Sequence, residues 1–419
     1  MLNPKEATYW DEKDMRKELD RIYDICHGCR LCFNLCPSFT NLFKYIDDKD
    51  GEVKELSRIE LDNVTDLCYQ CKLCYIKCPY TPPHNWDVDF PRLLLRDKAV
   101  RVKREGVSFQ DRALGNPDRT GKIGCRSAAL ANWTNRNPAA RFVMEKTIGV
   151  HRDRTLPEFH AQTFSDWFHS RKKRLESEKK VAFFATCFVN YNDPQQGIAA
   201  VEVLEKNGYE VLYPKQVCCG MPFIDGGDVS RATANMEENV REFQEVIDAE
   251  IPIVSPGPTC SYVLKNELPY FTGDSNAFEM AEHTQDICEF LVSLKAKKEL
   301  NTEFVHTPPM RIGYQIPCHL RAQNLGYKSM ELLRTIPNVD VELMENCSAM
   351  DGTWGMKKQF YQISLKLADK LLKEVKNVAP DEVCTDCPLS GIQIHQGTGK
   401  KPVHPVQILH RAYGLQDRH

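Results

Sequence analysis

The chain has 419 residues, of which 42% are hydrophobic and 27% are charged, and its formal net charge is −3. This length supports two or three domains with a sizeable core, and the balanced charge gives no indication of nucleic acid binding. The first 20 residues are charged and lack the apolar run of a secretory signal. No stretch approaches the roughly 18 apolar residues of a membrane-spanning helix. We therefore expect a cytoplasmic protein, with peripheral attachment at the inner membrane left open.

Cysteine stands out, because the chain contains 18 cysteines and most of them are grouped. A secreted disulfide scaffold would concentrate them in a short exported chain. Grouped thiolates in a long chain without an export signal indicate metal binding instead.

Two runs near the N-terminus share the spacing C-x2-C-x2-C-x3-C-P, namely CHGCRLCFNLCP over residues 26–37 and CYQCKLCYIKCP over residues 68–79. Bacterial ferredoxins hold [4Fe–4S] clusters with this run, in which the fourth cysteine binds the other cluster. Pro37 and Pro79 end the two ligand loops. The predicted ligands are Cys26, Cys29, Cys32 and Cys78 for cluster one, and Cys68, Cys71, Cys74 and Cys36 for cluster two.

Zinc is the alternative metal for paired cysteines, but two matched four-cysteine runs ending in proline favour iron–sulfur clusters. The 31 residues between Cys36 and Cys68 exceed what a minimal ferredoxin needs and look partly helical. The segment thereby resembles the all-α ferredoxin module of fumarate reductase iron–sulfur subunits and heterodisulfide reductases. His27 and His84 lie close to ligands in the sequence, and we interpret both as supporting or surface residues rather than ligands.

Residues 92–178 are basic in places and form the expected linker. Pro138 precedes a helical pattern, which suits a helix start. A helical linker with solvated charge is the simpler interpretation, and a docking face for a partner or for anionic headgroups is the alternative. Trp133 and Trp167 fit either a docking face or the core, and the isolated Cys125 is interpreted as a structural thiol.

The C-terminal part repeats itself. Three cysteines of one copy are followed by their counterparts after 131, 129 and 127 residues, which indicates an internal duplication. In each copy a short strand leads into the first cysteine, and helices then alternate with two further strands. This alternation predicts a parallel α/β sheet per half, with the cysteines gathered at one edge. The candidate cysteines are Cys187, Cys218, Cys219 and Cys260 in half one, and Cys318, Cys347, Cys384 and Cys387 in half two.

The pattern Cys…Cys-Cys-Gly…Cys resembles the cysteine-rich domain of the heterodisulfide reductases, found in their B subunit, and of its relatives. The segments PTCSYVLKNELP, PCHLRAQNLG, SAMDGTWGMK and CTDCPLSGIQIHQGTG are more similar to the C subunits of anaerobic glycerol-3-phosphate dehydrogenases. In that family two ferredoxin motifs also precede two cysteine-rich halves. The resemblance implies an iron–sulfur subunit that accepts electrons from a flavoprotein dehydrogenase and passes them on, often to membrane quinone.

Both halves depart from the family pattern, which has five cysteines per half. Gly257 and Ser348 stand where that pattern has cysteine, so each half offers four thiolates. Four suffice for a cubane cluster or for zinc, whereas five hold the noncubane cluster that cleaves a disulfide in heterodisulfide reductase. We therefore expect further iron–sulfur clusters or zinc in the halves and disfavour disulfide cleavage. The resemblance includes His319, for which we expect a hydrogen bond to a cluster sulfur.

The remaining candidates have simpler interpretations. Cys288 lies in an amphipathic helix pattern and is predicted to be a core thiol. His404 and His410 lie in a predicted C-terminal docking helix without chemistry. The chain has no Walker loop and no G-x-G-x-x-G after a strand, so we expect no nucleotide or flavin site.

The expected fold is multidomain, α plus α/β. It comprises an α-helical ferredoxin domain with two clusters (residues 1–91), a helical linker (92–178), and two cysteine-rich α/β halves (179–305 and 306–419). The expected function is electron transfer between a flavoprotein dehydrogenase and a quinone or other carrier, without a substrate site in this chain. Two alternatives stay open: a catalytic heterodisulfide or thiol reductase, and an electron donor to a peroxide-scavenging di-iron protein.

Overall fold

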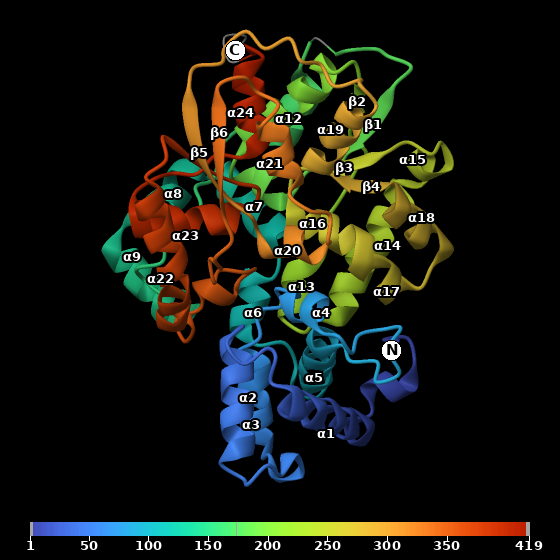
Figure 1. The fold of residues 1–419 in the computed structure, drawn as a ribbon, viewed down its shortest axis with the longest axis vertical. Helices are drawn as coiled ribbons and strands as arrows, with labels where there is room; N and C mark the ends of the chain where they lie inside the picture. Colours follow the sequence, from blue (N-terminus) through green and yellow to red (C-terminus); the bar gives the residue numbers. More distant parts are fainter. Residues whose placement is uncertain (1–2, 173, 416–419) are drawn as a thin grey trace.

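A computed structural model describes residues 3–172 and 174–415. A helical N-terminal part lies below two α/β lobes, and the described C-terminal end lies at the top (Figure 1). The combination of helical and parallel α/β parts agrees with the expected fold class. Within the described ranges, no helix combines the length and apolar character needed to cross a bilayer.

The N-terminal part is built from helices, including the segment between the two ferredoxin runs. Ser57 and Glu60 form a capping box at the start of the third helix, which satisfies backbone N–H groups there. Phe39, Phe43 and Leu61 are fully buried between the helices. The elements are η1 (Ala7–Trp10), α1 (Glu12–Cys29), α2 (Pro37–Asp47), η2 (Val53–Glu55), α3 (Arg58–Asp66), α4 (Leu73–Lys77) and α5 (Phe90–Glu105).

Helix α5 crosses the boundary expected between residues 91 and 92. The Asp89 side chain caps it by accepting a hydrogen bond from the Arg92 N–H at 3.0 Å, and Gly106, at φ 83°, ends it. The helix packs against α1 and α3. By its contacts α5 therefore belongs to the ferredoxin part rather than to the linker.

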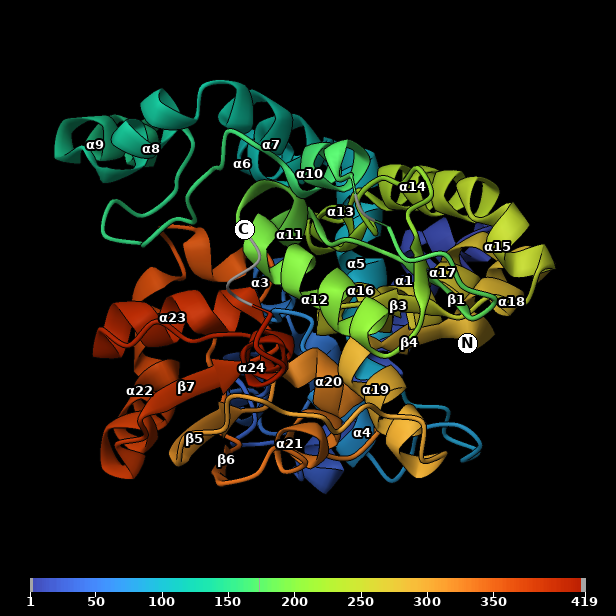
Figure 2. The same ribbon diagram turned by 90° about the horizontal axis from the view of Figure 1, so that it is seen from above.

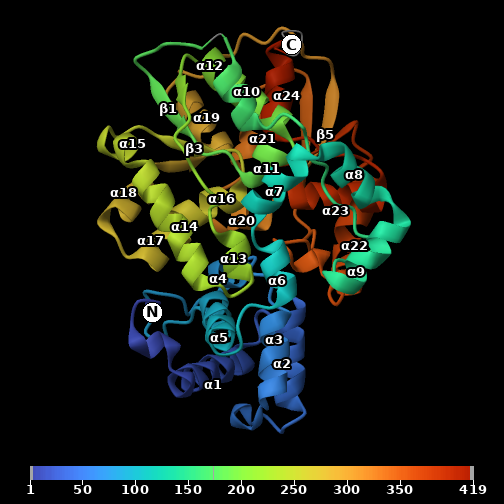
Figure 3. The same cartoon turned by 180° about the vertical axis from the view of Figure 1, so that it is seen from behind.

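The rest of residues 92–178 forms short helices along one side of the lobes. Helices α8 and α9 project furthest from the body (Figures 2 and 3). Asn137 caps the helix that begins at Pro138, as its pattern predicted. Trp133 is exposed, whereas Trp167 packs on the core. These helices are α6 (Phe109–Leu114), α7 (Pro117–Arg126), α8 (Ala128–Arg136), α9 (Pro138–Thr147) and α10 (Phe164–Ser170).

Half one contains a four-stranded parallel sheet with the order β2-β1-β3-β4. Ala182 of the central strand pairs with Leu212 on one side and with Ile253 on the other. The strands are β1 (Lys180–Phe183), β2 (Glu210–Leu212), β3 (Ile253–Ser255) and β4 (Thr284–Asp286), of which β4 was not expected from the sequence. The helical elements are α11 (Cys187–Tyr191), α12 (Pro194–Lys206), α13 (Met221–Asp225), α14 (Val229–Glu242), α15 (Gln244–Asp248), α16 (Pro258–Tyr262), the π-helical η3 (Val263–Glu267), α17 (Leu268–Thr272), α18 (Ser275–His283) and α19 (Ile287–Ala296).

Half two contains a three-stranded parallel sheet with the order β6-β5-β7. A single parallel bridge between Cys384 and Val403 stands where half one has its fourth strand. The strands are β5 (Met310–Gln315), β6 (Val339–Met344) and β7 (Glu382–Thr385). The helical elements are α20 (Cys318–Ala322), α21 (Lys328–Leu333), η4 (Trp354–Met356), α22 (Tyr361–Val378), α23 (Pro388–Thr398) and α24 (Pro405–Ala412).

One hydrophobic core joins the two halves. Val181 and Phe183 of β1 share this core with Ile312 and Tyr314 of β5. The C-terminal helix α24 docks on α12 of half one, as its pattern predicted. At that contact the His410 ring hydrogen-bonds a Glu202 oxygen at 2.5 Å. The two halves therefore share one hydrophobic core and form a single α/β unit.

Candidate iron–sulfur site

The first group of ferredoxin cysteines surrounds a small cavity at the end of α1. Cys26 and Cys29 lie in the last turn of that helix, and Arg30, at φ 52°, turns the chain into the following loop. Cys78 is the residue that follows α4. The group consists of Cys26, Cys29, Cys32 and Cys78, so the fourth cysteine of the second run joins the first three of the first run.

The second group lies where α2 begins. Cys36 is the residue just before that helix, and burial and then the charges of Cys68 and Cys71 raise the pKa of its thiol well above its ordinary value. Burial, followed by the charges of Cys71, Cys68 and Cys36, does the same for the pKa of Cys74. These four thiols are therefore neighbours, in the crossed arrangement that the spacing predicted.

Both groups fit a positively charged cofactor. Burial, with repulsion from neighbouring thiols, raises the pKa of Cys32 to about 11. Burial raises the pKa of Cys68 to about 12. Thiolates are the species that bind metal, and several thiolates can lie together in such a buried place when a metal centre supplies positive charge among them.

In half one the four candidate cysteines lie together. The Sγ atoms of Cys219 and Cys260 are 3.5 Å apart. Hydrogen bonds to Cys187 and Cys219 are the main cause of a strongly raised pKa at Cys218. The adjacent Asp118, on α7, accepts a hydrogen bond from the Cys218 N–H at 2.7 Å. The sequence did not single out Asp118, which ties the linker helices to this site.

The space at Gly257 explains one departure from the ten-cysteine pattern. A Cβ atom added to Gly257 would lie 2.5 Å from Cγ2 of Thr186, which is closer than van der Waals contact allows. Thr186 in turn caps α11 by accepting a hydrogen bond from the Val189 N–H at 3.0 Å. Threonine at 186 and glycine at 257 are therefore mutually adapted.

In half two, Cys318 and Cys347 contact the segment between α3 and α4, residues 67–72, which we call the ferredoxin loop. Hydrogen bonds to Cys347 and Cys71 are the main causes that raise the pKa of Cys318. The Tyr69 hydroxyl lies 3.6 Å from the Cys347 Sγ atom. The hydrogen bond from Cys318, with a smaller contribution from Tyr69, lowers the pKa of Cys347 to about 7. The second ferredoxin group and half two thus share one cysteine-rich contact.

The structure does not bring Cys384 to that contact, which corrects the expected four-thiolate set of half two. Cys384 lies inside β7, paired with Tyr314, and its side chain is buried in the core shared by the two halves. Strand β7 ends at Thr385, so Cys384 lies within the sheet whereas Cys387 lies beyond the end of the strand. Cys387 instead lines the large cavity beside half one.

Ser348, the second departure, faces another serine. Its Oγ atom lies 2.9 Å from that of Ser390, and both residues are buried. This hydroxyl pair satisfies polar groups where the family pattern places a thiolate.

His319 connects three parts of the molecule. From the sequence we expected its ring to hydrogen-bond a cluster sulfur, but both ring nitrogens have oxygen partners. Its Nε2 donates to the Gln70 carbonyl oxygen at 3.0 Å, and its Nδ1 accepts from the Thr259 hydroxyl at 2.9 Å. The carbonyl can only accept, which assigns the proton to Nε2. The ring also stacks on Tyr262 with centroids 5.3 Å apart. His319 therefore joins the ferredoxin loop, half one and half two.

The other histidines near the ferredoxin runs agree with a supporting role. The Nε2 atom of His27 lies 3.1 Å from an Asp47 oxygen. His84 accepts a hydrogen bond from the Trp86 N–H at 3.0 Å.

A second buried polar cluster lies between the halves. Asp286, Cys288 and Asp386 bring potential ligand atoms within 4.8 Å of one another, and all three are buried. Tyr314 and Ser329 donate hydrogen bonds to Asp386 at 2.7 and 2.6 Å. Burial, followed by the charge of Asp386, raises the pKa of Asp286 well above its ordinary value, which favours a proton held by the pair. Cys288 is thus buried, as predicted, but it lies next to the carboxyl groups of Asp286 and Asp386.

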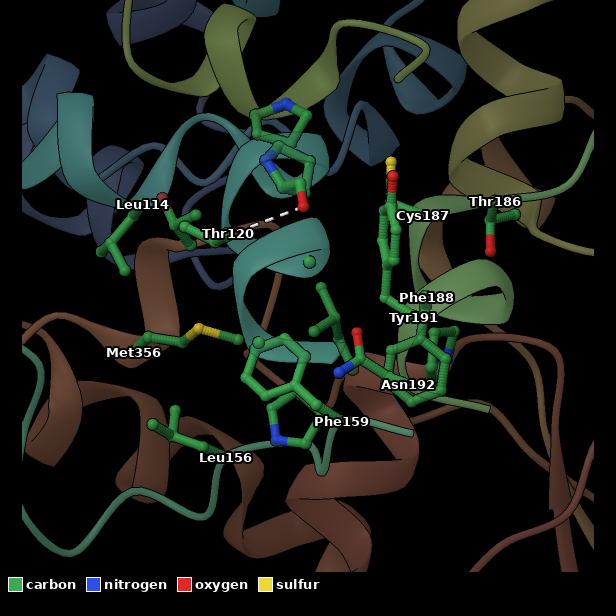
Figure 4. Close-up of a pocket in the computed structure, with 18 of the residues that line it drawn as sticks. Leu114, Thr120, Leu156, Phe159, Thr186, Cys187, Phe188, Tyr191, Asn192 and Met356 are labelled. Carbon is green, nitrogen blue, oxygen red and sulfur yellow. Dashed lines mark hydrogen bonds between the residues drawn. The ribbon is translucent and has the colours of Figure 1, made fainter. Parts of the chain in front are cut away.

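A cavity of about 650 Å³ lies between the linker helices and half one, and residues of half two such as Met356 and Cys387 complete its lining. Figure 4 shows Cys187, Phe188 and Tyr191 on one side of it, and Leu114, Leu156 and Met356 on the other. Its cysteines are Cys187, Cys218, Cys219, Cys260 and Cys387. The candidate thiols of half one are therefore reached from an apolar cavity.

Three segments of the chain match known domain families. Residues 181–265 and 312–395 both match the cysteine-rich domain family, and residues 19–105 match the Fer4-like domain of citrate utilization protein B. The chain contains a duplicated cysteine-rich domain behind a Fer4-like domain. The Fer4-like match extends to residue 105 and thus includes α5, in agreement with the contacts of that helix.

The proteins similar to this chain include subunits of a dehydrogenase and of a reductase. The C subunit of anaerobic glycerol-3-phosphate dehydrogenase from Escherichia coli strain K12 is 28% identical over 73% of this chain and 77% of its own length. The B subunit of fumarate reductase (CoM/CoB) from Methanothermobacter marburgensis is 27% identical over 55% of this chain and 44% of its own. Lactate utilization protein A of Geobacillus sp. strain WCH70 is 28% identical over 57% of this chain and its full length. The resemblance inferred from the cysteine pattern is thereby confirmed.

Sequence reasoning missed the residues that join this protein's cysteine-rich domain to its ferredoxin part. Tyr69, Gln70 and Lys72 are such residues, and the buried Lys72 ammonium lies 3.0 Å from a carboxylate oxygen of Glu267 in half one. Their only signal in the sequence is that they lie between ligand cysteines. Contacts over such separations are decided by tertiary packing.

Proposed function

We propose that this protein is the iron–sulfur electron-transfer subunit of a dehydrogenase complex. It accepts electrons from a flavoprotein dehydrogenase and delivers them to a quinone or other carrier. The chain supplies thiolate ligands and protein contacts, and the clusters supply one-electron redox chemistry when bound. The names of the related subunits of dehydrogenase and reductase complexes support this role.

The observation that carries the proposal is the contact between the ferredoxin loop and half two. Tyr69 and Cys71 belong to the second ferredoxin run, and they contact Cys347 and Cys318 of half two. Helix α4 also packs on α20. A second ferredoxin cluster held at Cys71 would therefore lie directly beside the cysteine-rich domain, which suits transfer between them.

The proposed ligands follow the grouping of the thiols. Cluster one takes the group around Cys26 and Cys78, and cluster two takes the group around Cys36 and Cys71. In half one, the four neighbouring thiols of Cys187, Cys218, Cys219 and Cys260 suit a further iron–sulfur cluster or zinc. In half two only Cys318 and Cys347 lie together at the ferredoxin loop, which argues for a different metal occupancy in the two halves.

Iron and acid-labile sulfide analysis of anaerobically purified protein, with EPR of the dithionite-reduced state, tests the proposal. Two cubane clusters require about eight iron atoms per chain. Cys26→Ala is expected to lose about four of them, whereas Cys125→Ala, a buried thiol outside both groups, is expected to lose none. Fewer than eight irons in the wild-type protein would contradict the two-cluster assignment.

A further inference from the structure

The large cavity has the size and lining of a small-molecule site. Its volume of about 650 Å³ falls within the roughly 300–1,000 Å³ of ligand pockets. One side carries the Cys187 thiol of half one, and the opposite side carries the apolar side chains of Leu114, Leu156 and Met356 (Figure 4). A molecule held there would be apolar and would lie beside candidate metal ligands.

The mouth of the cavity lies on an exposed apolar surface. Ile123 of α7 and Leu130 of α8 line the cavity, yet 57% and 63% of their surfaces are exposed. Trp133, Phe142 and Val143 extend this surface over α8 and α9 with exposures of 57%, 46% and 57%. Soluble proteins rarely expose such a set of large apolar side chains together unless it binds a partner or a membrane.

Positive charge surrounds the same surface. Residues 109–152 contain eight lysines and arginines but only three aspartates and glutamates, in a chain of net charge −3. One of these acids, Asp111, is neutralised by the Lys357 ammonium. The exposed cations are Arg112, Arg119, Lys122, Arg126, Arg136, Lys146 and Arg152, of which Arg136 pairs with Glu158 and Arg152 pairs with Glu145. Exposed aromatic and aliphatic side chains with a cationic surround are the features of helices that lie in the interface of an anionic bilayer.

We propose that the cavity binds a lipid-soluble quinone, which enters from a bilayer on which α7–α9 rest through their apolar–basic face (Ile123, Leu130, Trp133, Phe142, Val143 and the exposed cations). The inference rests on the proposed electron-transfer function. One quinone takes up two electrons, delivered one at a time by reduced iron–sulfur clusters, and two protons from water, and becomes one quinol. The clusters lose the same two electrons. The apolar lining accommodates the tail, and the thiol-bearing wall would place the ring beside an iron–sulfur cluster held by the thiols of half one.

A pair of substitutions on one helix tests the cavity. Ala131 of α8 lines it, whereas Ala129 of the same helix does not. Ala131→Phe is expected to weaken the binding of decylubiquinone, measured by isothermal titration calorimetry, by about tenfold or more. Ala129→Phe is expected to bind as the wild type does. Leu156→Trp fills the cavity from the opposite wall and gives the same expectation if Ala131→Phe does not fold. Unchanged binding in every folded filling variant would overturn the proposal.

The membrane arm uses vesicles of phosphatidylcholine with and without phosphatidylglycerol. The wild type is expected to float with the anionic vesicles and to reduce a long-tailed quinone embedded in them. The double variant Trp133→Glu, Phe142→Glu is expected to lose about tenfold or more of both activities while it still binds decylubiquinone in solution. Phe278→Glu, at an exposed phenylalanine of α18, is the matched control. Wild-type behaviour of the double variant on vesicles would overturn the proposed entry.

Failure of the cavity and failure of the relay give different results. A dithionite-reduced wild type that reduces ferricyanide but does not bind decylubiquinone would overturn the cavity and leave the relay standing. A protein that binds decylubiquinone but holds no reducible cluster would overturn the relay. The proposal for the cavity, which rests on it, would then lose its electron source and fall as well.

Discussion

The hydroxyl group of Tyr69 lies 3.6 Å from the Sγ atom of Cys347, although 278 positions separate the two residues. Tyr69 stands between two ligand candidates of the second ferredoxin run, and Cys347 follows a strand of half two. The hydrogen bond from Cys318 is the main cause of the lowered pKa of Cys347, and the Tyr69 hydroxyl adds a smaller contribution in the same direction. Through this contact, one hydroxyl group of the ferredoxin part lies next to a candidate ligand sulfur of half two.

Tyr69→Phe is therefore expected to lower the reduction potential of a cluster bound at Cys347, because hydrogen bonds to cluster sulfurs raise it. A hydrogen bond of about 1 kcal/mol corresponds to roughly 40 mV for one electron. EPR-monitored redox titration measures the change. Tyr45→Phe, which removes a hydroxyl bonded to Asn63 instead, should leave every potential unchanged. A potential unaffected by Tyr69→Phe would show that the hydroxyl has no influence on a cluster there.

The buried ion pair between Lys72 and Glu267 is expected to hold the ferredoxin loop on half one. Their charged atoms are 3.0 Å apart and the side chains are 2% and 0% exposed. Lys72→Met leaves the buried Glu267 carboxylate with the Arg92 guanidinium at 3.7 Å. We expect a loss of about 3 kcal/mol in the free energy of unfolding, measured by thermal unfolding under anaerobic conditions.

Two controls accompany Lys72→Met. Lys44→Met breaks the pair with Asp48, in which both side chains are more than half exposed, and should change stability little. The double variant Lys72→Met, Glu267→Met removes both charges and should recover part of the loss. Equal stability of Lys72→Met and Lys44→Met would contradict the role of the buried pair.

The acid pair between the halves makes stability depend on pH. Burial and Asp386 hold the pKa of Asp286 above its ordinary value, so the folded protein keeps a proton that the unfolded chain releases above about pH 4. Stability from this group therefore falls as the pH rises from about 4 towards the raised pKa. Asp286→Asn keeps the cap oxygen that receives the Cys288 N–H and removes the titration.

We expect Asp286→Asn to raise stability by about 2 kcal/mol at pH 8 and by less at pH 5. Melting temperatures from circular dichroism at both values measure the effect. Asp274→Asn makes the same substitution at an exposed helix cap and should show no such pH dependence. A gain for Asp286→Asn that is larger at pH 5 would refute the sign of this linkage.

The contact between Gly257 and Thr186 predicts a compensating pair. Gly257→Ala is expected to cost about 1–3 kcal/mol, because the new Cβ overlaps Cγ2 of Thr186. Thr186→Ser removes that methyl group and keeps the hydroxyl that caps α11. The double variant should therefore regain most of the stability lost by Gly257→Ala, as measured by thermal unfolding. Additive losses in the double variant would disprove the steric cause.

The sequence by itself was enough for features that depend on local spacing. The two ferredoxin runs, the duplication of the cysteine-rich halves and the parallel strands around Cys187 and Cys318 all follow from intervals of a few residues or from one repeat length. The glycine at 257 and the serine at 348 were visible as departures. Local geometry and hydrophobic alternation act over such short distances, so the chain displays them directly.

Only the tertiary structure decided which cysteines meet. Cys384 and Cys387 are close in the sequence, yet one is buried in the shared core and the other lines the cavity, because strand β7 ends between them. Tyr69 and Lys72 gained partners in the two halves through packing across the whole chain. Such contacts depend on how separate hydrophobic surfaces dock, which no pattern of neighbouring residues records.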